Sequence, residues 1–177
     1  MHVRDILISG NKKTKDYIIL REMTFKEGDS ILQRNIIFGL EKSKEFVYNT
    51  TLFEKVTLDT FMVSPYDFDV TVKVKERWYI FPIPQFQLVD RSFNEWLVKY
   101  NASFSRVNYG IKFEDKNLTG RKDQLKLYFI HGYPKNISFS YSEPYSNQKF
   151  THGYGFGGGY TQTIEITYNT ERLNNFL

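Results

Sequence analysis

The stretch Val107–Tyr145, VNYGIKFEDKNLTGRKDQLKLYFIHGYPKNISFSYSEPY, decides the fold, because three of its segments alternate apolar with polar residues. Side chains of a strand point to opposite faces with a period of two, so each segment is predicted to be a strand with one apolar face. A sheet lying on a soluble core contains such strands, and so does a transmembrane barrel around a polar lumen. We refer to the apolar positions as the wall residues: Ile111, Phe113, Leu125, Leu127, Phe129, Ile137 and Phe139.

Composition excludes some classes of protein, but it does not distinguish a sheet on a soluble core from the wall of a barrel. The 177 residues contain no apolar run long enough for a transmembrane helix and no signal peptide after Met1. The net charge of +4 is spread along the chain, so nucleic acid is not an expected partner. Without cysteine there is no disulfide framework. Of the 31 aromatic residues, 22 follow residue 77, which suits the girdles of a barrel and the core of a β-sandwich about equally.

The first 77 residues predict a small α+β domain of order β-α-α-β-β, in which two helices cover a three-stranded sheet. Thr14 is predicted to cap a helix that runs to Phe25, and Ser30 with Gln33 fits a capping box at the start of a second helix. That helix ends near Asn49. The predicted strands are Val3–Ser9, Phe53–Val63 and Val70–Val74, and the apolar face of the second helix comprises Ile36, Ile37, Leu40 and Val47.

The chain after residue 77 predicts five strands in all. Trp78–Val89 is extended but contains Pro82 and Pro84, which cannot donate to a ladder, so it is expected at a sheet edge or a strand start. A helical turn is expected near Trp96. The last strand has aromatic and aliphatic residues on one parity, up to Ile164, Ile166 and Tyr168, and glycine or polar residues on the other. A face lined with glycine favours a curved barrel wall over a soluble core.

The sequence contains no strong motif for a catalytic, metal-binding or phosphate-binding site. None of the three histidines has a metal-ligand partner at the usual spacing, and the three serines between Ile137 and Glu143 share one strand face without a nucleophile motif. The glycines of Gly153–Gly159 lack the Lys-Ser/Thr of a phosphate loop. We therefore predict no catalytic residue, no metal site and no cofactor, and we do not expect an enzyme.

The first domain resembles a POTRA (polypeptide-transport-associated) domain. The residues that carry the resemblance are Ile6–Asn11, Thr14–Met23, Glu27–Asp29 and Leu52–Val56, in this order along the chain. The resemblance implies that residues 1–77 are a POTRA-like domain of the bacterial periplasm.

The second part is similar to the start of the barrel in BamA-like outer-membrane protein assembly factors. The matching residues are Tyr109–Gly110, Asn117–Gly120 at a hairpin and Glu143–Tyr145 at the end of a strand. Because single-chain barrels begin at about eight strands, residues 78–177 are expected to be the N-terminal part of a barrel, and the chain a fragment.

The resemblance implies a function without bond chemistry. The POTRA domain would capture unfolded outer-membrane proteins by β-augmentation at the edge strand, and the wall residues would face lipid or detergent. The first barrel strand would be a seam that admits substrate strands. The implied edge residues are Lys55, Val56, Thr57, Leu58 and Asp59, and the implied seam residues are Ile80, Phe81, Ile83, Gln85 and Phe86.

The resemblance also implies a place and further partners. The expected location is the outer membrane of a Gram-negative bacterium, with accessory assembly lipoproteins as partners and self-association through exposed strand edges. Two alternatives stay open from the sequence: a two-partner-secretion pore that exports its substrate through the lumen, and a soluble periplasmic β-rich binding protein.

Overall fold

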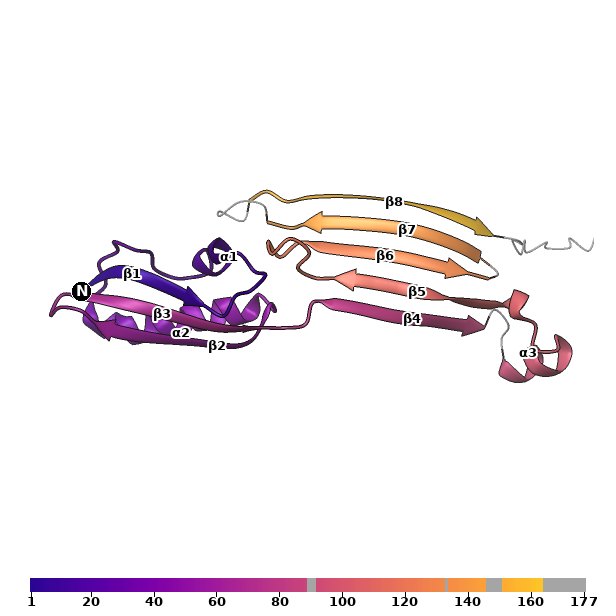
Figure 1. The fold of residues 1–177 in the computed structure, drawn as a ribbon, viewed down its shortest axis with the longest axis horizontal. Coiled ribbons are helices and arrows are strands. Elements are labelled where there is room, and N and C mark those ends of the chain that lie inside the picture. Colours follow the sequence, from indigo (N-terminus) through magenta and orange to yellow (C-terminus); the bar gives the residue numbers. More distant parts are fainter. Residues whose placement is uncertain (89–91, 133, 146–150, 164–177) are drawn as a thin grey trace, which may run out of the picture. The chain divides into compact units, whose positions relative to one another are not determined.

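The computed structural model describes residues 1–88, 92–132, 134–145 and 151–163. Val89, Ile164, Ile166 and Tyr168, which were assigned to predicted strands, lie outside these residues. The elements of the described chain, labelled in Figure 1, are β1 His2–Ser9, α1 Asp16–Leu20, α2 Gln33–Asn49, β2 Phe53–Met62, β3 Asp67–Glu76, β4 Ile80–Leu88, α3 Phe93–Lys99, a 3₁₀ turn Phe104–Arg106, β5 Val107–Asp115, β6 Gln124–His131, β7 Pro134–Glu143 and β8 Tyr154–Thr163.

The chain folds as two compact units. The first contains Met1–Phe81, Phe113–Lys126 and Ser140–Gly157, and the second contains Pro82–Lys112, Leu127–Phe139 and the described residues from Gly158. One end of strands β5–β8 therefore belongs to the same unit as β1–β3. Contacts between that end and the first 81 residues lie within a single unit.

The small sheet has the order β1-β3-β2, with β1 parallel and β2 antiparallel to the central β3. This bears out the predicted order β-α-α-β-β. Alternate residues of β3 are buried because they face the helices, and α1 and α2 add Ile18, Ile19 and Val47 to the same core. The other face carries ion pairs such as Lys75–Glu54 at 2.8 Å. The buried β3 residues are Phe68, Val70, Val72 and Val74.

The second sheet has the order β4-β5-β6-β7-β8 among the described residues, and neighbouring strands run in opposite directions (Figure 1). β4 is an edge strand that continues through Pro82 and Pro84. Two residues that stand two apart present their nitrogens to the same side of a strand, so both prolines can lie on the side that has no partner. The edge position thus explains how a strand can contain two prolines.

Ring contacts assign alternate residues of this sheet to two faces. Tyr109 and His131 lie 5.5 Å apart between ring centroids, which puts the odd-numbered residues of β5 and β6 on one face. Tyr141 lies 5.4 Å from Phe156, so the odd positions of β7 share a face with the aromatic positions of β8. On the opposite face the Lys112 ammonium lies 5.3 Å from the Tyr128 ring. The alternation read from the sequence therefore corresponds to two distinct faces.

The glycines of β8 lie close to small residues of the neighbouring strand β7. A Cβ atom on Gly159 would lie 2.6 Å from the Cβ of Ser138, and one on Gly155 would lie 3.4 Å from that of Ser142. Small residues thus meet small residues where β7 and β8 pair, on the face opposite the aromatic side chains. This close approach explains the glycine parity of the last described strand.

Four local predictions for the helices are wrong: the Thr14 cap, the first helix end at Phe25, the Ser30 capping box and the packing of Ile37. α1 has five residues and begins after Lys15, while the Thr14 hydroxyl bonds Tyr79 and Asn117 in place of the helix. α2 begins at Gln33 without a side-chain cap, because Ser30 bonds His2. Ile37 is 70% exposed, since the buried stripe of α2 runs through Ile36, Leu40, Ser43 and Val47.

Candidate functional site

The outer side of β2 is an exposed strand edge. Val56 is buried and Leu58 packs against the core, while Lys55 and Asp59 are exposed and Thr57 is half-buried. β2 pairs with β3 on one side, and it is the last strand of its sheet. A strand in this position has N–H and C=O groups that can pair with another chain.

The opposite edge of the same sheet is already occupied. Val3 on β1 donates its N–H to the Asp29 carbonyl at 3.0 Å and accepts from the Gly28 N–H at 2.8 Å. The Ile6 N–H donates to the Glu27 carboxylate at 3.1 Å. No segment of the described chain is hydrogen-bonded along the outer side of β2 in this way. The two edges are therefore unequal, and β2 is the one open to an added strand.

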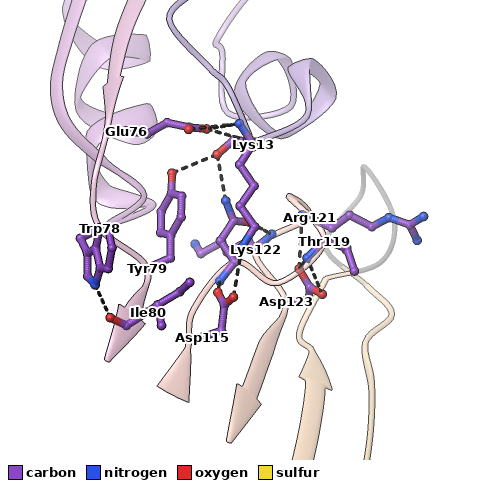
Figure 2. Close-up of polar contacts among 12 residues, drawn as sticks. Lys13, Glu76, Trp78, Tyr79, Ile80, Asp115, Thr119, Arg121, Lys122 and Asp123 are labelled. Atoms are coloured by element: carbon purple, nitrogen blue, oxygen red, sulfur yellow. Dashed lines mark hydrogen bonds and ion pairs between the residues drawn. The ribbon is translucent and has the colours of Figure 1, made fainter. Parts of the chain in front are cut away.

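A buried set of polar groups joins the loop after β1 to the strand ends of the first unit (Figure 2). Asn117 Nδ2 donates to Thr14 Oγ1 at 2.9 Å, and Thr14 Oγ1 lies 3.1 Å from the Tyr79 hydroxyl. The Tyr79 hydroxyl donates in turn to the Leu52 carbonyl at 3.0 Å. Thr14, Tyr79 and Asn117 are all buried. We call Lys13, Thr14, Tyr79, Asp115 and Asn117 the polar junction.

The charged side chains of Lys13 and Asp115, and of the neighbouring Glu76, form hydrogen bonds in and beside the polar junction. Lys13 Nζ donates to Asp115 Oδ2 at 3.0 Å, and Asp115 Oδ1 accepts from the Asn117 N–H at 2.9 Å. The Glu76 carboxylate accepts from the N–H groups of Lys13 and Thr14. Burial pushes the pKa of Glu76 upward, but these hydrogen bonds outweigh burial and hold that pKa below its ordinary value. Burial raises the pKa of the Tyr79 hydroxyl.

The turn between β5 and β6 lies directly against the loop after β1. The Gly120 carbonyl accepts from the Lys15 N–H at 2.9 Å, and a Cβ on Gly120 would lie 2.1 Å from the Lys13 carbonyl oxygen. Gly120 also has φ +84°, so both the backbone conformation and the lack of space for a Cβ atom require glycine here. Asn117 Oδ1 accepts from the Lys122 N–H at 2.9 Å. The segment Asn117–Gly120, noted in the sequence as a hairpin match, is thus part of the contact.

Sequence reasoning missed Lys13, Tyr79 and Asp115 as members of one cluster. One signal was present: Asp115 continues the parity of Ile111 and Phe113, so it places a carboxylate at the end of an apolar strand face. A charge at such a position needs a partner. The partner, Lys13, lies 102 residues away in the chain, and no local sequence pattern distinguishes it from other lysines.

None of the wall residues belongs to the buried core of the described chain. Three are half-buried, and the other four are 42–56% exposed. They share the face defined by Tyr109 and His131 or by Tyr141, and they do not converge on a closed interior. The exposed four are Ile111, Phe129, Ile137 and Phe139, and the half-buried three are Phe113, Leu125 and Leu127.

The predicted seam residues lie on the edge strand β4. Phe81, Ile83 and Phe86 are exposed, while Ile80 and Gln85 are half-buried. Among the residues that the structure describes, no helix is both long enough and apolar enough to cross a membrane.

Residues 1–77 match the family model POTRA, described as surface antigen variable number repeat. The match covers less than half of the 177 residues, so it describes this segment and not the whole chain. Among solved structures the chain is similar to BamA from Haemophilus ducreyi lacking POTRA domains 1–3, with 23% identity and a TM-score of 0.63 over 91% of this chain. It also matches CdiB from Acinetobacter baumannii at 15% identity, with a TM-score of 0.48 over 89% of this chain and 28% of CdiB. A comparison with curated protein sequences finds no match.

These findings confirm the predicted fold class. A POTRA domain is followed by antiparallel strands arranged as in BamA, and the sheet is not closed within the described residues. The likeness to BamA at 23% identity concerns the fold, and the chain spans 27% of the length of that BamA structure.

Proposed function

We propose that this chain is the membrane-proximal part of an outer-membrane protein assembly factor. Residues 1–77 would be a POTRA domain in the periplasm, and residues 78–177 would be the first strands of a barrel wall in the outer membrane. The POTRA domain captures unfolded outer-membrane proteins, and the wall templates their strands so that backbone groups are not left unpaired in lipid. Accessory lipoproteins are proposed as further partners.

The observation that carries the proposal is the inequality of the two POTRA edges. β1 is covered by the segment around Gly28 and Asp29, while β2 offers its backbone over ten residues. Because β-augmentation needs a free edge, an incoming strand would pair with β2. Lys55, Val56, Thr57, Leu58 and Asp59 form the middle of that edge.

The second support is the uncovered apolar face of the open sheet. Seven apolar side chains on adjacent strands, none of them buried, would associate with other apolar groups in water. Lipid or detergent satisfies this face, and the edges β4 and β8 are available for pairing with a substrate strand or with a second copy of the chain. β4, with two prolines, is the weaker of the two as a hydrogen-bonding template and suits a seam that opens.

The proposal is tested by photo-crosslinking of the full chain in detergent micelles. A photoreactive residue at Lys55 on β2 is compared with one at Leu7, which is 52% exposed on β1. An unfolded outer-membrane protein, added from urea, is expected to crosslink at Lys55 in preference to Leu7. Equal yields at the two positions, or preference for Leu7, would refute capture at the β2 edge.

A further inference from the structure

A small pocket lies within the first unit, between the segment that leads into β4 and the turn that joins β5 to β6. Its volume is about 140 Å³, several times the roughly 30 Å³ that one water molecule occupies in the liquid. Arg77, Lys116 and Lys122 line it together with Trp78 and Phe81. No acidic side chain of the described chain is part of the lining.

The charges of the three cations of this pocket, Arg77, Lys116 and Lys122, are not neutralised within its lining. None of them forms an ion pair within the part of the chain that the structure describes. Arg77 Nε donates to the Phe53 carbonyl at 2.7 Å, which fixes the guanidinium without neutralising it. Lys116 Nζ lies 5.0 Å from the centroid of the Phe81 ring. The pocket therefore concentrates positive charge beside apolar rings.

Of the three pocket cations, Lys122 is the least exposed: it is half-buried, whereas Arg77 and Lys116 are exposed. Burial lowers the pKa of Lys122, an effect that Glu22 opposes and Arg21 reinforces. Glu22 itself lies 3.6 Å from Arg21, so its charge is shared between two cations. A second anion beside Lys122 would favour the ammonium form and be held by it.

The surroundings of the pocket indicate where such an anion would come from. Trp78 is 73% exposed and stands two residues before β4. Tryptophan at the ends of membrane strands lies at the level of the lipid headgroups. Basic pockets beside membrane-spanning segments bind anionic headgroups.

We infer that the pocket of Arg77, Lys116 and Lys122 binds the phosphodiester headgroup of an anionic membrane lipid. Guanidinium and ammonium groups donate to phosphate oxygens, and the rings of Trp78 and Phe81 adjoin the glycerol and the first acyl carbons. The membrane origin of the ligand rests on the proposed function, whereas the affinity for a phosphodiester rests on the three cations alone.

The test uses native mass spectrometry of the full chain released from dodecyl maltoside micelles. Dioctanoyl phosphatidylglycerol is titrated in, and dioctanoyl phosphatidylcholine and inorganic phosphate are titrated separately. One saturable phosphatidylglycerol site is expected. Each of Lys116→Gln and Lys122→Gln should weaken it by roughly tenfold or more, as the loss of a hydrogen bond to a charged group implies. Lys122→Arg should retain binding, which separates loss of charge from misfolding.

Lys44→Gln is the matched control, because Lys44 is an exposed lysine on α2 with the same change of charge. Loss of affinity in Lys44→Gln equal to that in Lys122→Gln would overturn the inference, as would equal binding of phosphatidylcholine. If inorganic phosphate binds as tightly as phosphatidylglycerol, the pocket holds phosphate but not lipid, and the inference fails. A failure of capture at β2 would leave these titrations unchanged, so the two proposals fail separately.

Discussion

Asn117→Ala is expected to open the polar junction. The Asn117 side chain is completely buried, and it donates to Thr14 Oγ1 and accepts from the Lys122 N–H, both at 2.9 Å. A buried polar group that loses its partner costs about 1–3 kcal/mol. We take the lower value for each group, because Thr14 Oγ1 keeps the Tyr79 hydroxyl and the Lys122 N–H is only partly buried. The loss is then about 2 kcal/mol, which is about 30-fold in the equilibrium between closed and open forms.

Amide hydrogen exchange of the full chain in micelles measures this loss directly. In Asn117→Ala the N–H of Lys122 should exchange about 30-fold faster, and the N–H of Lys15, which donates to the Gly120 carbonyl, should follow because it belongs to the same contact. Leu118→Ala changes the next residue, which is 36% exposed, and should leave both rates within about twofold. Unchanged exchange at Lys15 and Lys122 in Asn117→Ala would show that the junction does not hold the turn in solution.

The effects of three further substitutions are predicted in the same unit. Gly28→Ala, at φ +86° with open space, should cost about 1–2 kcal/mol. Gly10→Ala should cost about 1–3 kcal/mol more, since its Cβ would lie 2.0 Å from the Val74 carbonyl oxygen; urea midpoints that rank the two variants in the opposite order would contradict this. Because the pKa of Glu76 is lower in the folded chain than its ordinary value of about 4.3, its contribution to stability is complete above that pH and lost as the pH falls through the folded value. Glu76→Gln should therefore lower the urea midpoint at pH 7, and this effect should shrink as the pH falls below the ordinary pKa of a glutamate. An effect that does not shrink with falling pH would argue against the hydrogen-bonded carboxylate.

The strands could be predicted because their signal is local. Alternation with a period of two is visible within β5, β6 and β7, and the structure bears out both their positions and their two faces. Pro82 and Pro84 marked an edge strand for a reason that any sheet obeys. Strand faces therefore followed from the sequence without knowledge of the partner strands.

The helix starts were mispredicted because their capping residues serve distant partners. Thr14 looked like a cap, but its hydroxyl lies against Tyr79 and Asn117, which are 65 and 103 residues away. Ser30 is bound to His2 across 28 residues. A local pattern cannot reveal such competition, since both uses satisfy the same hydroxyl.

The buried stripe of α2 was mispredicted because hydrophobicity was used in place of helical spacing. It includes Ser43, whose hydroxyl donates to the Gly39 carbonyl at 2.7 Å, and it excludes the more apolar Ile37. Helical spacing from Ile36 and Leu40 selects position 43 regardless of its polarity. Spacing was thus the better guide, and hydrophobicity alone was misleading.

The central claim, that the wall residues face lipid, is tested most directly by single-cysteine spin labels on a chain that has no native cysteine. Labels at Phe129 and Ile137 on the apolar face are compared with labels at Tyr128 and Ser138 on the other, with the full chain in lipid bilayers. We predict that oxygen, which concentrates in lipid, relaxes the labels at 129 and 137, and that a water-soluble nickel chelate relaxes those at 128 and 138. Equal accessibility of both pairs to the nickel chelate, or protection of 129 and 137 from oxygen, would contradict a membrane wall.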